Sequence, residues 1–327
     1  MTPPEIISLG ETMVLLYPPD LTTPLNSVRQ LVVDVAGADS NFAIAMARLG
    51  FHAGWISRVG ADPLGELVRD TVAREGVDVS QVIVDPGHPT GLYVKHHPPD
   101  GHPLVLYYRR GSAASYLAPA DIRPAYFAEI KVLQVNGMTL ALSRSCEEAV
   151  LRAVQLARKA RALISLDLNL RLQLWTLSTA RHVLGKLLPT VSLLTGTEDE
   201  FLQFFEKRTL VDAMIEAHGR GPRTVVATRG DKGAVALVGG RVVSHPGYVP
   251  PQVVDTVGAG DGFNAGFIAS VLRGLKPEEA LRIANRIGAA AVTTPGDFQG
   301  YPTLREIEND PGWPERHGDG RDFSGTA

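Results

Sequence analysis

A regular alternation of short apolar strands with amphipathic helices fills the second half of this 327-residue chain. The predicted strands are Lys131–Val135, Ala162–Asp167, Ser192–Thr195, Thr224–Thr228 and Gly233–Val238. The predicted helices are Glu147–Lys159, Thr179–Leu187, Leu210–Ala217, Gly262–Arg273 and Pro277–Thr293. Parallel strands need long right-handed connections, which helices provide. The alternation therefore predicts an α/β fold with a doubly wound, mostly parallel sheet flanked by helices.

The first third of the chain is richer in strands. We expect strands and helices at Glu5–Leu16, Leu31–Ala36, Ser40–Leu49 (helix), Ala53–Val59, Pro63–Glu75 (helix), Gly91–His97 and Leu104–Arg109. A turn at Pro98–Gly101 joins the last two strands into a hairpin. These strands are interleaved with the α/β core in sequence. We therefore expect the segments of about 10–37 and 91–113 to leave the central sheet and pair as a small β-sheet lid.

Composition places the chain among ordinary globular proteins, with 44% hydrophobic and 20% charged residues. The net charge of −3 gives no sign of nucleic-acid binding. Cys146 is the only cysteine, so no intrachain disulfide forms. Because no signal peptide or long apolar run is present, we expect a cytoplasmic protein that does not enter membranes. One domain covers residues 1–308, and we expect the Gly- and Pro-rich tail 309–327 to be poorly ordered.

The segment Asp255–Gly266 carries the strongest chemical signal. Gly258 and Gly260 allow the backbone to approach a ligand closely, at the start of a predicted helix whose free N–H groups suit an anion. Asp261 stands at the same helix start, where it can accept a proton from a hydroxyl group. The combination suggests phosphoryl transfer to an alcohol. The alternative is a tight turn with an Asp N-cap, and a Walker A loop is excluded because no Gly-Lys-Ser/Thr follows.

This segment resembles the signature of the PfkB (ribokinase-like) family of carbohydrate kinases, which reads Asp-Thr-x-Gly-Ala-Gly-Asp. Gly37–Ala43, Ala47–Gly50 and Val59–Gly65 resemble a second region of that family. The resemblance implies a large α/β domain with a β-sheet lid over a sugar site, and use of ATP and Mg²⁺. It also implies that Asp261 is the catalytic base and that the amides of Gly258, Ala259 and Gly260 hold the transferring phosphoryl group.

The same resemblance gives expectations for the nucleotide side. It implies that the loop after Thr228 binds ATP through residues such as Gly230 and Gly233, and that Asn285 lies near the adenine. Asn169, which follows a core strand, is a further candidate on this side. By itself, the loop after Thr228 is also typical of a simple β-turn.

Two carboxylates are candidates for binding cations. Thr195–Glu198 occupies the place of the family's Asn-x-x-Glu motif, with Thr195 in place of Asn. Glu198 is therefore expected to act on Mg²⁺ indirectly, through water. The resemblance also makes Asp255 a candidate for a monovalent cation such as K⁺, a requirement that the sequence leaves open.

Tyrosine and arginine side chains of the predicted lid suggest an anionic sugar. Alternation puts Tyr107 and Arg109 on one face of their strand, and Tyr93 is on the partner strand. Arg171 follows a core strand, at the edge where ligands bind. A neutral ligand would leave these guanidinium groups without an anionic partner, which is costly if they are buried. The alternatives are cross-strand aromatics with solvated arginines, and contact of Arg171 with the ATP phosphates.

Within the family, these motifs resemble those of the 2-keto-3-deoxygluconate kinases. The likeness implies that the sugar acid contacts Gly37, Ala38, Asn41, Tyr93, Tyr107, Arg109, Arg171 and Asp297. Asp297 is equally consistent with a surface turn. The expected reaction is ATP-dependent phosphorylation of the terminal hydroxyl of 2-keto-3-deoxygluconate, with the galactonate epimer left open. The alternatives are a kinase of a neutral sugar, such as ribose or fructose, and a non-catalytic binding regulator. Exposed lid edges favour a homo-oligomer.

Overall fold

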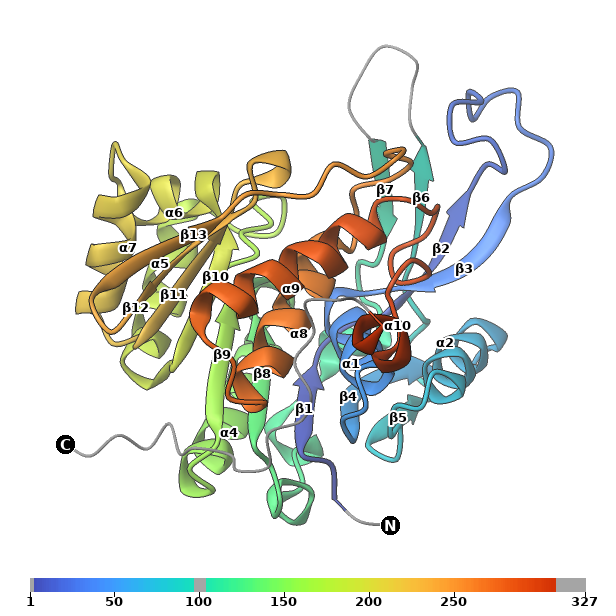
Figure 1. The fold of residues 1–327 in the computed structure, drawn as a ribbon. Coiled ribbons are helices and arrows are strands. Elements are labelled where there is room, and N and C mark those ends of the chain that lie inside the picture. Colours follow the sequence, from blue (N-terminus) through green and yellow to red (C-terminus); the bar gives the residue numbers. More distant parts are fainter. Residues whose placement is uncertain (1–2, 97–103, 310–327) are drawn as a thin grey trace.

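The computed structural model describes residues 3–96 and 104–309, and a nine-stranded sheet forms its centre (Figure 1). The strands are β1 (Ile6–Leu9), β4 (Ala53–Gly60), β5 (Val82–Asp85), β8 (Val132–Asn136), β9 (Leu163–Asp167), β10 (Leu193–Thr197), β11 (Thr224–Thr228), β12 (Ala234–Val238) and β13 (Arg241–His245). Their order is β13-β12-β11-β10-β9-β8-β1-β4-β5. Among these neighbours, β11–β12 and β12–β13 are antiparallel, and the other pairs are parallel. The predicted α/β fold with a mostly parallel sheet is confirmed.

Helices cover both faces of this sheet. The first face packs against α1 (Ala38–Arg48), α2 (Pro63–Arg74), α8 (Ala259–Leu272) and α9 (Pro277–Ala291). The second packs against α4 (Arg144–Lys159), α5 (Leu177–Leu187), α6 (Glu198–Phe205) and α7 (Leu210–Gly219). Side chains of one strand alternate between the two apolar cores: Ile6 belongs to the first, whereas Ile7 and Leu9 belong to the second. A sheet buried on both faces explains why its strands are continuously apolar.

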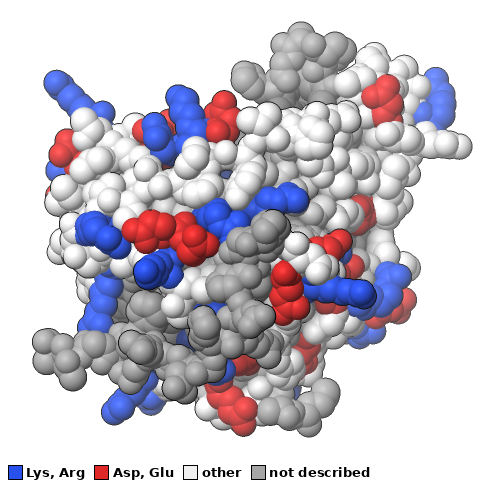
Figure 2. Space-filling view, in the orientation of Figure 1, with Lys and Arg blue, Asp and Glu red and all other residues white. Residues whose placement is uncertain are grey.

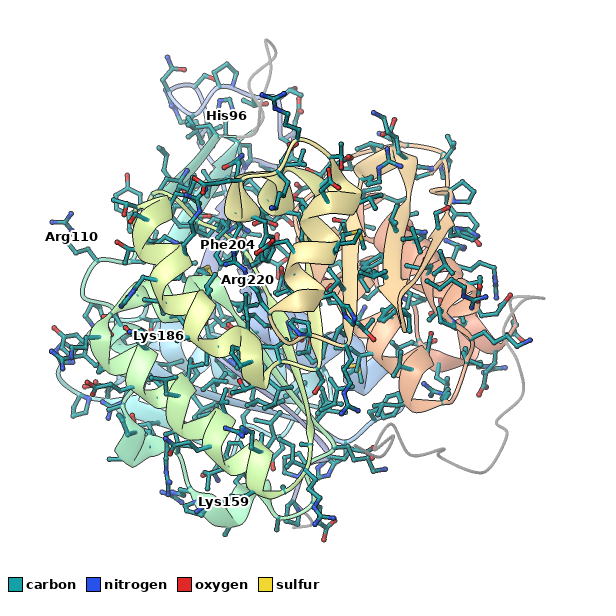
Figure 3. The ribbon with its side chains drawn as sticks, turned by 90° about the vertical axis from the view of Figure 1, so that its left-hand side faces the viewer. His96, Arg110, Lys159, Lys186, Phe204 and Arg220 are labelled. Atoms are coloured by element: carbon teal, nitrogen blue, oxygen red, sulfur yellow. The ribbon has the colours of Figure 1, made fainter. Side chains whose placement is uncertain are left out.

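The outer surfaces of these helices carry the charged residues that the amphipathic pattern indicates. Figure 3 looks onto α4 and α5, where Lys159 and Lys186 point away from the sheet. In Figure 2 both signs of charge are scattered over the visible face. In the described part of the chain, no helix combines the length and the apolar character needed to cross a membrane.

A second sheet of four strands, the lid sheet, lies beyond one end of the large sheet (Figure 1). Its strands are β2 (Met13–Tyr17), β3 (Val32–Ala36), β6 (Leu92–His96) and β7 (Leu104–Tyr108), in the order β3-β2-β6-β7. The predicted antiparallel pairing of the last two strands is confirmed. The turn Pro98–Gly101 and the tail from residue 310 lie outside the described residues.

The prediction of one strand over Glu5–Leu16 is wrong. The chain leaves the large sheet after β1 and enters the lid sheet at β2, with a break at Gly10. A Cβ atom at Gly10 would lie 1.9 Å from Asp39 Oδ2, so the backbone passes too close to that side chain for any other residue. The Gly10 carbonyl also accepts hydrogen bonds from Trp55 and Ser57. The sequence does not reveal this break, because β1 and β2 are both buried and therefore both apolar.

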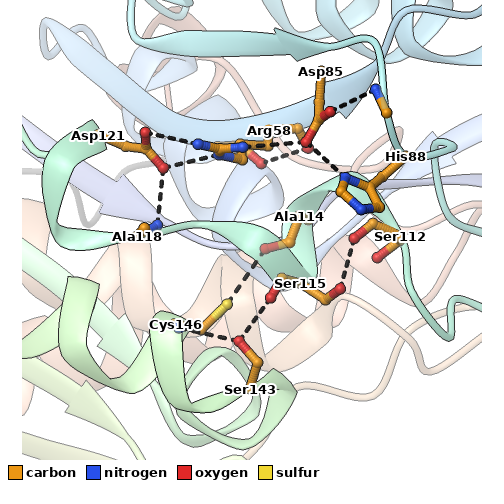
Figure 4. A network of polar contacts seen from close by, with 12 residues as sticks. Arg58, Asp85, His88, Ser112, Ala114, Ser115, Ala118, Asp121, Ser143 and Cys146 are labelled. Carbon is orange, nitrogen blue, oxygen red and sulfur yellow. Dashed lines mark hydrogen bonds and ion pairs between the residues drawn. The ribbon is translucent and has the colours of Figure 1, made fainter.

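Polar contacts fix the segment that returns from the lid sheet to the core (Figure 4). Arg58 of β4 forms ion pairs with Asp85 and Asp121, at 3.1 and 2.8 Å. Ser143, the N-cap of α4, donates a hydrogen bond to the Ser115 carbonyl at 2.6 Å. The base of the lid is therefore attached to both the large sheet and its covering helices.

Candidate active site

A cavity of about 420 Å³ lies between the lid sheet, the carboxyl ends of β9, β10 and β11, and the beginning of α8. Ligands of open α/β sheets bind at this edge. Of the predicted site residues, those lining the cavity are Gly37, Ala38, Asn41, Tyr93, Tyr107, Asn169, Arg171, Thr228, Gly258, Gly260, Asp261 and Asp297. Most of the residues expected from the sequence therefore come together around one cavity.

Helix α8 begins without a side-chain cap, and its first residues open onto this cavity. Gly258 has a φ angle of 85°, and a Cβ atom there would lie 1.9 Å from the Asp297 carbonyl oxygen. Only glycine fits this approach. Tyr301 donates a hydrogen bond to the Gly258 carbonyl at 2.6 Å and fixes the loop from behind. Uncapped N–H groups and the positive end of the helix dipole are chemically suited to an anion.

Asp261 lies in the first turn of α8, and the N-cap is Gly258, so the alternative of an Asp N-cap is wrong. The Asp261 carboxylate accepts a hydrogen bond from Asn41 Nδ2 at 2.9 Å. Burial raises the pKa of Asp261 to about 7, and the charges of Asp297 and Asp39 act in the same direction. The Asn41 hydrogen bond and Arg171 oppose this rise in pKa. A carboxylate with this pKa is suited to exchange protons near neutral pH.

A second group of carboxylates lies beside Asp261. Burial raises the pKa of Asp167, at the end of β9, well above its usual value, and the nearby Glu200 and Asp261 raise it further. Asn264 donates a hydrogen bond to Asp167 at 3.0 Å. Glu200 accepts from the backbone N–H groups of Leu170 and Thr197, at 2.7 and 2.8 Å. Carboxylates this close together make each other harder to ionise.

The structure does not place Glu198 with these carboxylates. Glu198 forms an ion pair with Arg229 at 3.0 Å and is not among the cavity-lining residues, whereas Glu200 is. Thr197 and Glu200 have the same spacing as the Asn-x-x-Glu motif, two residues later than the assignment made from the sequence. That second register was the signal for Glu200. The strand ending at Asp167 was the signal for the other carboxylate, which the sequence assignment also missed.

Arg171 lines the cavity and is exposed to it. Its guanidinium group has no ion-pair partner among the described residues. Asn169, two residues earlier, has a left-handed φ of 35° and also lines the cavity. The tight backbone at Asn169 brings both side chains to the carboxyl end of the sheet.

Tyrosines of the lid sheet form the opposite wall. The rings of Tyr93 and Tyr107 are 5.6 Å apart, and the Tyr93 hydroxyl donates to Asp297 at 3.1 Å. Asp297 is 3% exposed, so the alternative of a surface turn is wrong. Burial raises the pKa of Asp297, which the neighbouring Lys95 opposes.

Arg109 does not lack an anionic partner, contrary to the argument from the sequence. Its guanidinium group forms a buried ion pair with Glu11, 98 positions earlier in the chain and lies 5.5 Å from the ring centre of Tyr107. Its Nη1 atom contacts the sulfur of Met138, which lines the cavity. Arg109 is therefore behind the cavity wall.

Asp255 also has an unforeseen partner. Lys95 of β6 contacts this carboxylate, and both side chains are fully buried. The position considered for a monovalent cation is therefore next to an ammonium group of the protein itself.

On the nucleotide side, Thr228 lines the cavity, whereas Gly230 and Gly233 form the short turn between β11 and β12. A Cβ atom at Gly233 would lie 2.1 Å from the His245 carbonyl, so packing alone requires this glycine. Asn285 of α9 donates to the same carbonyl at 3.4 Å. Neither glycine nor Asn285 is among the cavity-lining residues.

Comparison with known proteins identifies the family. The model of the pfkB family carbohydrate kinases matches residues 3–304. The chain belongs to this family. It is therefore a carbohydrate kinase, and family membership implies the use of ATP and Mg²⁺.

Three relatives show how far the likeness extends. The 2-dehydro-3-deoxygluconokinase of Bacillus subtilis (strain 168) is 36% identical, over 93% of this chain and 94% of the relative. The 2-dehydro-3-deoxygalactonokinase of Haloferax volcanii is 30% identical, over 90% of this chain and 92% of the relative. An E. coli protein crystallised with ATP and Mg²⁺ is 26% identical, with a TM-score of 0.87 over 93% of this chain and 98% of that protein.

Proposed function

We propose that the protein transfers the γ-phosphoryl group of ATP to the terminal hydroxyl of 2-keto-3-deoxygluconate, a sugar acid. One observation carries this proposal: an uncapped helix start, a carboxylate with a raised pKa and an exposed arginine line the same cavity. The helix start suits a phosphoryl group, Asp261 suits a hydroxyl and Arg171 suits a carboxylate.

The anionic end of the substrate is assigned to Arg171. A guanidinium group binds a carboxylate through two parallel hydrogen bonds, which fixes both its position and its orientation. Tyr93 and Tyr107 provide hydroxyl and ring contacts along the sugar chain. Arg109 takes a secondary part, because Glu11 already neutralises its charge. Binding energy from the carboxylate end then positions the reacting hydroxyl at the other end.

Asp261 is assigned as the base that accepts the proton of that hydroxyl. The hydrogen bond from Asn41 occupies Oδ2 of the carboxylate and orients the side chain. Oδ1 then accepts the hydroxyl proton while the hydroxyl oxygen attacks the γ-phosphorus and the bond from that phosphorus to the bridging oxygen of ADP breaks. The amides at Gly258, Ala259 and Gly260 bind the phosphoryl oxygens, where charge is greatest.

Asp167 and Glu200 line the cavity and are the carboxylates that fit Mg²⁺. We assign them the role that the sequence suggested for Glu198. The described residues contain no cluster of three or more metal-ligating side chains, which agrees with the preference of Mg²⁺ for one or two carboxylates, substrate phosphates and water. Bound there, Mg²⁺ would neutralise phosphate charge. Asn169 and Thr228 flank the same region and are assigned to the nucleotide. Use of ATP and the free, buried Cys146 favour a cytoplasmic location.

A substrate panel tests the proposal. The purified protein is mixed with ATP and Mg²⁺, and ADP release is measured with the gluconate and galactonate epimers of the 2-keto-3-deoxy acid, ribose and fructose. Both epimers belong in the panel because relatives named for each share 36% and 30% identity with this chain. We expect the highest kcat/KM with a sugar acid. A neutral sugar as the best substrate would disprove the sugar-acid assignment.

Arg171→Ala separates recognition of the sugar acid from recognition of ATP. Loss of a charged hydrogen-bonded pair should lower kcat/KM for the sugar acid by about 10–100-fold, with little change for a neutral sugar or in the KM for ATP. Arg110→Ala is the matched control, since Arg110 points away from the molecule in Figure 3. An equal loss for both sugar types, with a raised KM for ATP, would assign Arg171 to the phosphates instead.

A further inference from the structure

Lys95 is a fully buried lysine that projects from the lid sheet towards the phosphoryl-binding loop. Its Nζ atom is 3.0 Å from Asp297 Oδ1 and also contacts Asp255 Oδ2. The ring centre of Tyr17, in the neighbouring lid strand, is 5.9 Å from the same nitrogen. Burial lowers the pKa of Lys95, but the charges of Asp297 and Asp255 outweigh this effect, and the net result is a raised pKa. The side chain is therefore an ammonium cation.

The two carboxylates belong to the two chain segments that meet at Gly258. Asp255 is three residues before it and accepts a hydrogen bond from the Val257 N–H at 3.1 Å. Asp297 is in a separate loop, and its carbonyl oxygen occupies the space that a Cβ atom of Gly258 would need. A single ammonium group thus joins the two segments whose contact shapes the start of α8.

Two buried carboxylates that share one cation are costly to form and need that cation to persist. The ammonium group of lysine has the charge of an ammonium ion and three of its four N–H donors, and it is held between carboxylate oxygens that would also suit K⁺. Lys95 is part of strand β6. The cation between the two carboxylates is therefore a side chain of the lid sheet and not an ion from solution.

We propose that Lys95 is a positioning residue that acts as a built-in monovalent cation. It holds the loop before α8 in its phosphoryl-binding shape, links that loop to the lid sheet and makes catalysis independent of added K⁺. This inference rests on the proposed kinase site and adds a residue that touches neither the sugar nor ATP.

The test compares buffers in which K⁺, NH₄⁺ or the bulky tetramethylammonium ion is the only monovalent cation. The wild-type protein should have the same kcat in all three. Lys95→Ala opens space beside the two carboxylates, and its kcat should fall about 100-fold in tetramethylammonium. In K⁺ or NH₄⁺, the kcat of Lys95→Ala should be at least about 10-fold higher than in tetramethylammonium. Lys95→Met fills the same space, so these ions should not rescue it.

Lys131→Ala is the matched control, because Lys131 forms an exposed ion pair with Glu5. Its kcat should equal that of the wild type in every buffer. The proposal is overturned if wild-type activity requires K⁺. It is also overturned if Lys95→Ala, assayed in tetramethylammonium at a temperature below its Tm, has the kcat of the wild type, or if K⁺ and NH₄⁺ fail to restore the kcat of folded Lys95→Ala.

A readout without substrate separates this inference from the proposed function. In tetramethylammonium, the Tm of Lys95→Ala should fall by about 5–10 °C because two buried carboxylates lose the cation that they share. K⁺ should raise the Tm of this variant but leave that of the wild type unchanged. This result would support the built-in cation even if no sugar in the panel were phosphorylated. Equal responses of both proteins to K⁺ would reject it.

Discussion

Asp261 combines two opposing influences on its charge. Burial raises its pKa to about 7, and the hydrogen bond from Asn41 lowers it. A base acts only when deprotonated, so activity is present above this pKa and is lost as the pH falls through it. Asn41 therefore does more than line the cavity, because its hydrogen bond lowers the pKa of the carboxylate and favours the ionised form.

A pH–rate profile checks this role. In the wild type, kcat/KM should decrease below about pH 7. Asn41→Ala removes the hydrogen bond that lowers the pKa, so the acidic limb should move to higher pH. Asn309→Ala is the control, because Asn309 is exposed and is not among the cavity-lining residues. An acidic limb that stays in place in Asn41→Ala would show that another group limits the rate.

The start of α8 depends on a close contact between two backbones. Gly258 has a left-handed conformation and lies against the Asp297 carbonyl, and these two constraints have separate costs. Gly274, just after the other end of the same helix, also has a positive φ of 75° but has no atom within 4 Å of the position of a Cβ. Substitution of Gly274 therefore tests backbone strain alone, whereas substitution of Gly258 also displaces the neighbouring backbone.

Gly258→Ala should lower kcat by about 100-fold, because the added Cβ displaces the amides from the phosphoryl group. Gly274→Ala should cost about 1–2 kcal/mol of unfolding free energy through strain alone and leave kcat unchanged. Steady-state kinetics and urea unfolding of both variants provide the measurements. Wild-type kcat in Gly258→Ala would argue against a role for these amides in catalysis.

The whole molecule presents an apolar outer face on the lid sheet. Leu104, Leu106 and Tyr108 alternate with the cavity-lining Val105 and Tyr107 along β7, and all three are exposed. Among the described residues, strand β7 is also an edge strand of its sheet. An exposed apolar edge of this kind suits a second copy of the chain, as the sequence suggested.

Sedimentation or light scattering tests this association. The wild type should have at least twice the monomer mass, and Leu104→Lys with Leu106→Lys should reduce it to that of a monomer. Val242→Lys is the control, since Val242 is an exposed apolar residue on β13, at the far edge of the large sheet. A monomeric wild type, or a lid variant of unchanged mass, would contradict association through the lid.

Local patterns were sufficient for the fold and for placing Gly258–Asp261 at a helix start, because alternation, turns and helix starts depend on neighbouring residues. Thr195–Glu198 and Thr197–Glu200 both fit the four-residue motif, and the tertiary structure places Glu200 at the cavity and Glu198 beside Arg229. The partners Glu11 of Arg109 and Lys95 of Asp255 are far away in sequence. Such pairs arise from tertiary packing, which no local pattern contains.

Asp261→Asn tests most directly whether Asp261 removes the proton of the substrate hydroxyl. This variant is assayed for turnover with ATP and the sugar acid, and for binding of each by calorimetry. We predict a loss of about 10²–10⁴-fold in kcat, with dissociation constants within a few-fold of the wild type. A variant with near-normal turnover would contradict the claim.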